Sequence, residues 1–246
     1  MKSVKEIFNK TLELVKECGD ILKDVDYEKE TVAKEDGSLV TKYDLLVDKK
    51  LTEGLKQIAD YPVLSEEHEE NLGNNYFIID PIDGTHNFNA GYESFGIIVA
   101  YIENEETLFS IVHCPVLDKT YTAIKGEGAY LNGKRIFVRE NKPKRLIGTC
   151  GISIEGLEII NKLISSKEKI DLRSIFSVEE YCKVASGIFD FCIYHKEGLW
   201  DFIGPKLIIE EARGILRHKK LNGDKYQIIA GTQKAVEIIG QITQIL

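Results

Sequence analysis

The chain has 246 residues, of which 43% are hydrophobic, enough for one large globular unit or two small domains with a substantial core. Its net charge of −8 argues against a surface that binds a nucleic-acid polymer. No apolar stretch reaches the roughly 18–20 residues that span a bilayer, and the N-terminus lacks the long apolar block of a secretory signal. We therefore expect a soluble, cytoplasmic protein without a membrane partner.

The cysteines and histidines indicate neither a disulfide framework nor a zinc site. The five cysteines are scattered, with no CxxC pair, so we expect structural, reduced thiols. The five histidines form no HxxxH or HxH pair, which argues against a zinc hydrolase. Dinucleotide-binding, nucleotide-loop and serine-hydrolase functions have no local support, because GxGxxG, Walker and GxSxG motifs are all missing.

Two amphipathic helices are predicted in the N-terminal part. Apolar residues recur at helical spacing over residues 3–25. The string "KEDGSL" contains a turn signal, and "VTKYD" leads into a second helix, whose apolar stripe ends before Tyr61 and Pro62. The next segment, "YPVLSEEHEENLGNN", is polar and rich in turn residues after one short apolar stub.

Residues 76–140 predict a largely antiparallel sheet. The runs "YFIID", "FGIIVAYI", "TLFSIVHC" and "KTYTAI" are short, rich in β-forming residues and separated by turn residues. Asn132-Gly133 is a strong hairpin signal. We therefore interpret "GEGAYLNGKR" as a hairpin and not as a phosphate-binding loop.

Strands and helices alternate after "ENKPKR". We expect strands at 145–149, 170–175, 188–194 and 226–230, and helices at about 155–166, about 178–187, about 201–213 and the C-terminus. Alternation of this kind suggests a sheet covered by helices. The Lys142–Lys144 stretch is a plausible boundary between an N-terminal α+β subdomain, residues 1–141, and a C-terminal α/β subdomain, residues 142–246.

The string "DPIDGTHNF" at Asp80–Phe88 ends an apolar strand in two carboxylates. Crowded carboxylates repel each other unless a positive charge lies between them or they form an acid/base couple. Pro81 fixes its own backbone angle, so that the side chains of Asp80 and Asp83 can converge. The Ile82 carbonyl is left free as a third oxygen ligand. Oxygen-only clusters of this type suit hard cations, Mg²⁺ above all.

The residues that follow these carboxylates suit an anion. Gly84 and Thr85 offer backbone N–H groups at what we expect to be a helix or turn start, an arrangement that suits phosphate. His86 comes next, and we expect it to face substrate or solvent.

Other acidic positions stand out by their context, and each has a simpler interpretation. Asp44 follows "VTKY" at the start of the second helix and could be its N-cap. Glu66 and Glu67 could belong to a solvated acidic run, "EEHEE". Asp83 could be an ordinary turn aspartate before glycine. Asp201 follows the only tryptophan, in "GLWDFIGP", and could be another N-cap.

Four motifs together resemble the inositol monophosphatase superfamily of Mg²⁺-dependent, lithium-sensitive sugar and nucleotide phosphatases. The string "DPIDGTHNF" is similar to its signature, "LSEEH" to its upstream Glu-Glu element, "VTKYD" to its helix-start aspartate, and "LWDFIGPKLIIEEARG" to its C-terminal Trp-Asp element. They occur in the family's order over roughly residues 35–216. The resemblance implies a layered αβαβα sandwich, the sugar-phosphatase fold. Its N-terminal sheet is largely antiparallel, its smaller C-terminal part is alternating α/β, and we expect the metal site at their seam.

The resemblance also implies two or three Mg²⁺ ions and a set of ligands for them. The implied metal ligands are Glu66, Asp80, the Ile82 carbonyl, Asp83 and Asp201. Among these, Asp80 is expected to bridge two ions, and Glu66 to complete the site that activates water.

Catalytic and substrate-binding roles follow from the same resemblance. Asp44 is expected to act through water, with Thr85 paired to it so that the two orient the attacking water beside Glu66. The residues implied to contact the substrate or its phosphate are Asp83, Gly84, Thr85, Glu180 and Asp201. Direct in-line attack by water is favoured, and Asp80 as an aspartyl nucleophile stays open as an alternative.

The sequence departs from the family pattern at two places. His86 stands where Thr, Ala or Phe is usual. The stretch "RSIFSVEEYC" has Phe176 where glycine is expected, is not followed by Ala-Ala, and is one residue short. The residue that binds substrate hydroxyls is assigned to Glu180 across this gap, which leaves the identity of the substrate more open than the reaction.

We therefore expect a phosphoric monoester hydrolase that acts on a small sugar or polyol phosphate resembling myo-inositol 1-phosphate. The alternatives within the superfamily are a fructose 1,6-bisphosphatase, a 3′(2′),5′-bisphosphate nucleotidase and a histidinol-phosphate phosphatase. A non-enzymatic alternative is a divalent-cation-binding regulator that kept the fold and lost turnover. The family suggests a homodimer, for which the apolar runs at 95–114 could supply an interface.

Overall fold

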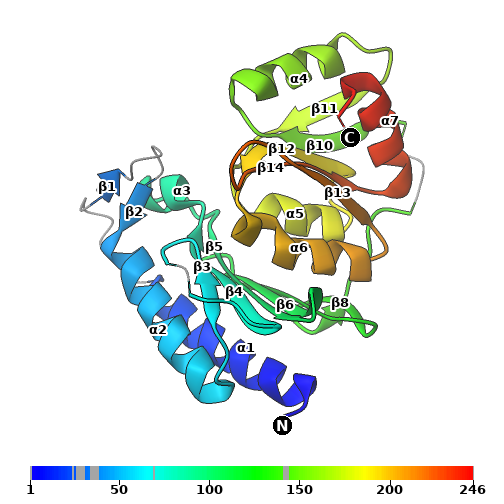
Figure 1. Ribbon diagram of the computed structural model, residues 1–246. Helices are drawn as coiled ribbons and strands as arrows, with labels where there is room; N and C mark the ends of the chain where they lie inside the picture. The colour runs from blue at the N-terminus through cyan, green and yellow to red at the C-terminus, as the bar shows by residue number, and fades with distance from the viewer. Residues whose placement is uncertain are drawn as a thin grey trace.

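The structure is a computed structural model that describes residues 2–23, 25, 31–33, 39–68, 70–140 and 144–245. The described residues form five layers, in the order helices, sheet, helices, sheet, helices (Figure 1). This is the predicted αβαβα sandwich. Most of the predicted "KEDGSL" turn and most of the predicted boundary at Lys142–Lys144 lie outside the described residues.

Two helices form the first layer, α1 (Val4–Ile21) and α2 (Lys42–Ile58). Each begins at a hydroxyl residue that caps it, Ser3 and Thr41, because a side-chain oxygen satisfies N–H groups that the first turn leaves free. The first helix ends one turn earlier than its predicted limit at residue 25. A short antiparallel pair, β1 (Thr31–Ala33) and β2 (Leu39–Thr41), lies between the two helices in sequence.

The larger sheet has seven strands, which lie in sequence order from β3 to β9. Only β3 and β4 pair in parallel, which confirms the largely antiparallel sheet predicted for this part of the chain. Both residues of the predicted Asn132-Gly133 hairpin have positive φ, 48° and 76°, as tight hairpin turns require. The strands are β3 (Val63–Ser65), β4 (Asn75–Asp83), β5 (Gly96–Glu103), β6 (Glu106–Cys114), β7 (Lys119–Ile124), β8 (Gly128–Leu131) and β9 (Lys134–Arg135).

The smaller sheet has five strands in the order β11-β10-β12-β14-β13. The first three are parallel, and the last two are antiparallel to their neighbours. Strand β13 was not predicted, because its sequence, "ILRHKK", is mostly polar and its last four residues are exposed at the sheet edge. The strands are β10 (Leu146–Cys150), β11 (Ile170–Arg173), β12 (Phe191–Glu197), β13 (Ile215–Lys220) and β14 (Tyr226–Gly231).

Four helices cover this sheet on its two faces (Figure 1). Helices α4 (Ile154–Ile164) and α7 (Gln233–Thr243) form the outer layer, while α5 (Glu179–Ala185) and α6 (Leu199–Glu211) fill the space between the two sheets. A short helix, α3 (Thr85–Asn89), follows β4. The predicted alternation of strands and helices is therefore confirmed, except that β13 was not predicted.

The middle layer joins the two sheets through one hydrophobic cluster. It contains Val112 from the seven-stranded sheet, Phe202 from α6 and Ile228 from the five-stranded sheet, all fully buried. Gly204 lets α6 approach the larger sheet closely, because a Cβ atom there would lie 2.8 Å from the Ser110 hydroxyl. Although the two sheets lie on either side of residue 141, the division into two subdomains stays a prediction.

All five cysteines are buried and none forms a disulfide, in agreement with the predicted reduced thiols. Burial raises the pKa of Cys18 and of Cys150 to about 12, so these thiols are protonated and unreactive in the folded protein.

Within the described part of the chain, no helix combines the length and the apolar character that crossing a membrane requires.

Candidate metal centre and active site

Strand β4 places Asp80 and Asp83 at its end, where a bulge interrupts its pairing with β5. Asp80 lies opposite Ile98 and Asp83 lies opposite Gly96, so β4 contains one extra residue at Pro81 and Ile82. Side chains three positions apart on a regular strand point to opposite faces of a sheet, and one extra residue returns them to the same face. The bulge therefore explains how the two predicted carboxylates converge.

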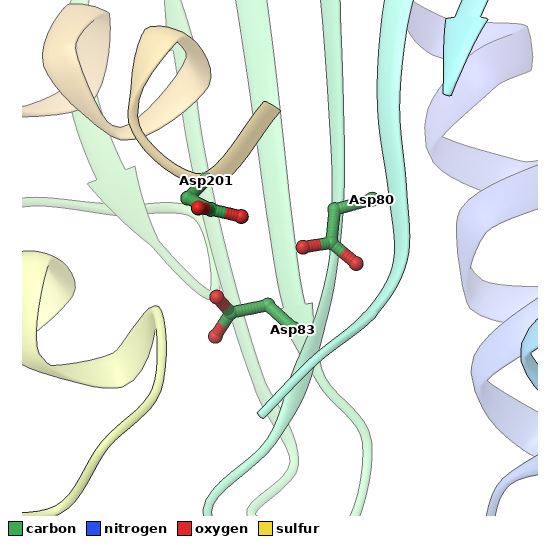
Figure 2. Close-up of side chains that lie close together, drawn as sticks. All are labelled: Asp80, Asp83 and Asp201. Carbon is green, nitrogen blue, oxygen red and sulfur yellow. The ribbon is translucent and has the colours of Figure 1, made fainter. Parts of the chain in front are cut away.

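A third carboxylate reaches this point from the other half of the chain. Asp201 lies in the first turn of α6, and ligand oxygens of Asp80, Asp83 and Asp201 all lie within 4.8 Å of one another. Figure 2 shows the three side chains pointing toward one common volume. The N-cap of α6 is Gly198, whose N–H donates to Asp201 at 2.6 Å, so the simpler interpretation of Asp201 as an N-cap residue is wrong.

The three carboxylates are poorly solvated and repel one another. Burial and the charge of Glu66 raise the pKa of Asp80 well above its usual range. Burial and the charge of Asp201 do the same to the pKa of Asp83. Burial raises the pKa of Asp201 to about 6. Three oxygen donors that resist ionisation without a counter-charge fit a hard cation such as Mg²⁺.

Glu66 and Ile82 line the same cavity as the three aspartates. Glu66 follows β3 and is half-buried, as is its neighbour Glu67, so the alternative of a fully solvated acidic run does not describe them. The Ile82 carbonyl accepts the Thr85 hydroxyl at 3.0 Å, whereas we had expected this carbonyl to be free. One lone pair of that oxygen remains for another partner.

Asp44 sits in the first turn of α2, three residues after the N-cap Thr41. Its carboxylate accepts the Thr41 N–H at 2.7 Å, and its own N–H donates to the Thr41 hydroxyl at 3.3 Å, so that the two residues form a capping box. The carboxylate also accepts the Thr41 hydroxyl. Asp44 itself is therefore not the N-cap residue that the simpler interpretation expected. Its other oxygen lies 3.5 Å from the Thr85 hydroxyl oxygen, and the catalytic pairing of Asp44 with Thr85 stays a prediction. Burial raises the pKa of Asp44 to about 6.

Gly84 is the N-cap of α3 and has a φ of 86°, a left-handed conformation that favours glycine. A Cβ atom there would also lie 3.0 Å from the Ser177 side chain and 3.2 Å from the Ser94 carbonyl. Gly84, Thr85 and His86 all line the cavity, and His86 is exposed, as we expected.

Glu180 is not among the described residues that line the cavity. It is buried, and it accepts the Thr149 hydroxyl at 2.6 Å, the Ile175 N–H at 2.7 Å and the Tyr194 hydroxyl. These donors occupy both of its oxygens, and its assignment to substrate hydroxyls stays a prediction.

Glu197 is a member of the site that the sequence analysis did not single out. It lines the cavity at the end of β12, next to a bulge between His195 and Glu197. Burial and the charge of Asp201 raise its pKa well above the usual range. Its position four residues before Asp201, in "EGLWD", is the only sequence signal that could have pointed to it.

The cavity measures about 790 Å³ and combines acidic, basic and aromatic groups. Lys196 and Lys225 supply positive charge at its walls. Lys196 pairs with Glu155 at 2.7 Å, and the Lys225 amine lies 5.9 Å from the centre of the Trp200 ring. The aromatic side chains that line the cavity are those of Phe176, Tyr181, Tyr194 and Trp200.

Comparisons with known proteins give one consistent result. The model of the "Inositol monophosphatase family" matches residues 3–244. A "Fructose-1,6-bisphosphatase/inositol-1-monophosphatase" from Thermotoga maritima is 32% identical over 183 residues, which cover 72% of this chain and 70% of the relative.

Solved structures share the fold over nearly the whole chain. An IMPase structure from Thermotoga maritima matches with a TM-score of 0.86 and 26% identity, and the match covers 96% of each chain. A structure described as an IMPase/NADP phosphatase complexed with Mg²⁺ and phosphate also matches, with a TM-score of 0.86 and 23% identity. That second match covers 98% of this chain and 96% of the other.

Proposed function

The chain belongs to the inositol monophosphatase family and is a phosphatase of that superfamily, and we propose that it hydrolyses a small sugar or polyol phosphate with the help of Mg²⁺. The observation that carries the proposal is the cluster of Asp80, Asp83 and Asp201 in an open cavity. The favoured substrate is of the myo-inositol 1-phosphate kind. Fructose 1,6-bisphosphate is the second candidate, because a relative's name combines both activities.

The donor chemistry of the cluster supports two or three Mg²⁺ ions. We propose that these ions bind the carboxylates of Glu66, Asp80, Asp83 and Asp201 together with the Ile82 carbonyl. Bound Mg²⁺ supplies charge neutralisation at the phosphoryl group and lowers the pKa of the attacking water. One matching structure is described as a complex with Mg²⁺ and phosphate, which supports the same chemistry here.

Asp44 and Thr85 form the pair that we propose to orient the attacking water. The single Thr85 hydroxyl proton has two acceptors within reach, the Ile82 carbonyl at 3.0 Å and the Asp44 carboxylate at 3.5 Å, and with either one the Thr85 oxygen is left to accept a proton from water. A pKa of about 6 makes Asp44 a base that is largely ionised at neutral pH and still basic enough to share a proton.

The phosphate itself is proposed to lie against the backbone N–H groups of Gly84 and Thr85. The left-handed backbone of Gly84 turns the chain sharply there, which supports N–H groups facing the cavity. Asp83 and Asp201 would face the leaving group. The alternative in which Asp80 is an aspartyl nucleophile has less support, because one Asp80 oxygen already accepts the Ile82 N–H at 3.0 Å and the side chain is buried.

We also propose that the protein is cytoplasmic, which its reduced, buried cysteines support, and that it forms a homodimer, as the family resemblance suggests. The expected interface at the apolar runs 95–114 is wrong, because these runs form β5 and β6, whose apolar residues are buried in the core.

The deciding experiment measures phosphate release from myo-inositol 1-phosphate, fructose 1,6-bisphosphate and a generic phosphomonoester, each with Mg²⁺ and with EDTA. We expect Mg²⁺-dependent release, with the polyol phosphate as the best substrate. No release from any phosphomonoester, together with Mg²⁺ binding by calorimetry, would favour the non-enzymatic cation-binding regulator instead. Release that EDTA leaves unchanged would contradict the proposal.

A further inference from the structure

We propose that Glu179 is a positioning residue for the metal centre, because it fixes the backbone segment whose N–H group holds Asp83. The inference rests on the proposed function, since it gives Asp83 the role of a metal ligand. Glu179 itself does not line the cavity among the described residues. It acts on the site through Ser177 and Val178.

The contact that matters joins two segments far apart in the chain. The Val178 N–H donates a hydrogen bond to one carboxylate oxygen of Asp83, 95 positions earlier. This bond fixes the rotation of the Asp83 side chain and uses only one of its two oxygens. Partners of this kind orient a ligand and tune its basicity, although they never touch the metal.

Val178 lies just before α5, at the end of a segment that has no regular secondary structure. The Ser177 hydroxyl lies 2.8 Å from the Ser94 hydroxyl and accepts the Glu179 N–H at 3.3 Å. The position of the Val178 N–H therefore depends on what holds Ser94, Ser177 and Glu179 together.

The Glu179 carboxylate provides that attachment. One oxygen accepts the Lys119 ammonium of β7 at 3.0 Å, and the other accepts the Ser94 hydroxyl at 2.7 Å and the Lys183 ammonium at 3.1 Å. Glu179 is only 4% exposed. It thus ties the first turn of α5 to the seven-stranded sheet, where Asp83 is located.

The neighbouring Glu180 makes the complementary attachment to the other sheet. Its carboxylate accepts the hydroxyl groups of Thr149 and Tyr194, in β10 and β12, and the N–H of Ile175. Two consecutive carboxylates at the start of α5 therefore fix the segment that ends at Val178 from opposite sides. Glu179 and Glu180 thus both act by holding this segment in position.

A purely stabilising role would not need this arrangement. Removing two charges from water is costly, and well-packed apolar residues often stabilise a buried site as well as an ion pair does. An apolar pair, however, provides no directed bonds that would hold the Val178 N–H in one place. We therefore expect the loss of Glu179 to affect metal binding more than folding.

The test compares Glu179→Gln with Asp190→Asn as a matched control. Asp190 is another buried carboxylate, paired with Arg139 at 3.3 Å and bonded to the Ile147 N–H at 2.8 Å, outside the metal centre. Three readouts are taken on each protein: Mg²⁺ affinity by calorimetry in the presence of phosphate, the Mg²⁺ concentration for half-maximal phosphate release, and the melting temperature in EDTA.

We expect Glu179→Gln to weaken Mg²⁺ affinity and to raise the half-maximal Mg²⁺ concentration by about 10-fold or more. Asp190→Asn should leave both close to wild type at a similar loss of melting temperature. Amide hydrogen exchange at Val178 should also become faster in Glu179→Gln. Lys119→Met keeps Glu179 but removes one of the lysines that bind it. We expect it to raise the half-maximal Mg²⁺ concentration as well, by a smaller factor.

Wild-type Mg²⁺ affinity and normal Val178 exchange in Glu179→Gln and Lys119→Met would overturn the proposal. An equal loss of Mg²⁺ affinity in Asp190→Asn would also overturn it, because the effect would then follow stability alone. A failure of the proposed function is separate from both, because it appears in the wild-type protein as phosphate release that does not depend on Mg²⁺.

Discussion

The side-chain amide of Asn87 donates a 2.9 Å hydrogen bond to the backbone carbonyl of Phe176, 89 positions later in the chain. The same amide nitrogen lies 2.8 Å from the Ile175 carbonyl and 2.7 Å from the Ser94 carbonyl. Phe176 has a φ of 60°, a left-handed conformation that is unfavourable for a residue with a large side chain. Asn87 thus anchors a strained residue whose ring lies at the cavity wall, 43% exposed.

The ring of Phe176 should therefore restrict which substrates enter. We expect both Phe176→Gly and Phe176→Ala to raise kcat/KM for bulky phosphomonoesters relative to small ones. Glycine tolerates the left-handed backbone and alanine does not, so Phe176→Gly should be the more stable of the two by about 1 kcal/mol. Steady-state kinetics on a small and a bulky substrate, with thermal melts, would check this. An unchanged ratio of the two kcat/KM values would show that the ring does not select substrates.

Asp80→Asn tests the most buried member of the carboxylate cluster. The substitution keeps the shape of the side chain but removes a charged metal ligand, and metal ions contribute several kcal/mol to stabilising the charge of a transition state. We expect turnover to fall by about 10³-fold or more, while the circular dichroism spectrum stays that of the wild type. Near wild-type turnover at saturating Mg²⁺ would remove Asp80 from the site.

Asp201→Asn tests the ligand that comes from the other half of the chain. Asparagine can still accept the Gly198 N–H that caps α6, so the helix should begin as before. We expect the Mg²⁺ concentration for half-maximal activity to rise by at least about 10-fold. A Mg²⁺ titration identical to that of the wild type would count against this role.

The raised pKa values predict how stability without metal depends on pH. Asp80, Asp83 and Asp201 bind protons more tightly in the folded chain than an unfolded Asp, whose pKa is about 3.9. The contribution of these three carboxylates to the free energy of unfolding therefore falls as pH rises above about 4, and that of Asp201 is fully lost above its pKa of about 6. Mg²⁺ binds the ionised form, so its stabilising effect should grow over the same range.

Thermal melts in EDTA and in Mg²⁺ between pH 5 and pH 8 would measure this dependence. Asp83→Asn serves as the control, because it removes one repelling charge and should flatten the decline in EDTA. The opposite result would be a melting temperature in EDTA that rises with pH, and rises more steeply in the wild type than in Asp83→Asn. That result would rule out this account.

Local signals in the sequence were sufficient for most of the fold and for the centre of the site. Asp80 and Asp83 could be found because a proline, a glycine and two carboxylates interrupt an apolar strand. Periodicity also identified α6, which carries Asp201. The bulge in β4 was not predicted, because its position depends on pairing with β5, although Pro81 inside a paired strand is a signal for one.

Features that depend on tertiary contacts were missed or assigned differently. Strand β13 is polar because it lies at a sheet edge, so it lacks the alternation by which strands are recognised. Glu179 and Glu180 look like an ordinary acidic helix start in the sequence. Their separate attachments to the two sheets depend on Lys119 and Thr149, which are distant in the chain.

The burial of the five cysteines gives the protein an internal set of chemical reporters. A thiol-specific reagent can modify them only when the surrounding structure opens, so the rate of labelling measures how often each layer opens. Cys18 reports on α1, Cys114 on the larger sheet and Cys192 on the smaller one. Labelling with and without Mg²⁺ would thus reveal whether the two sheets open at the same time or one after the other.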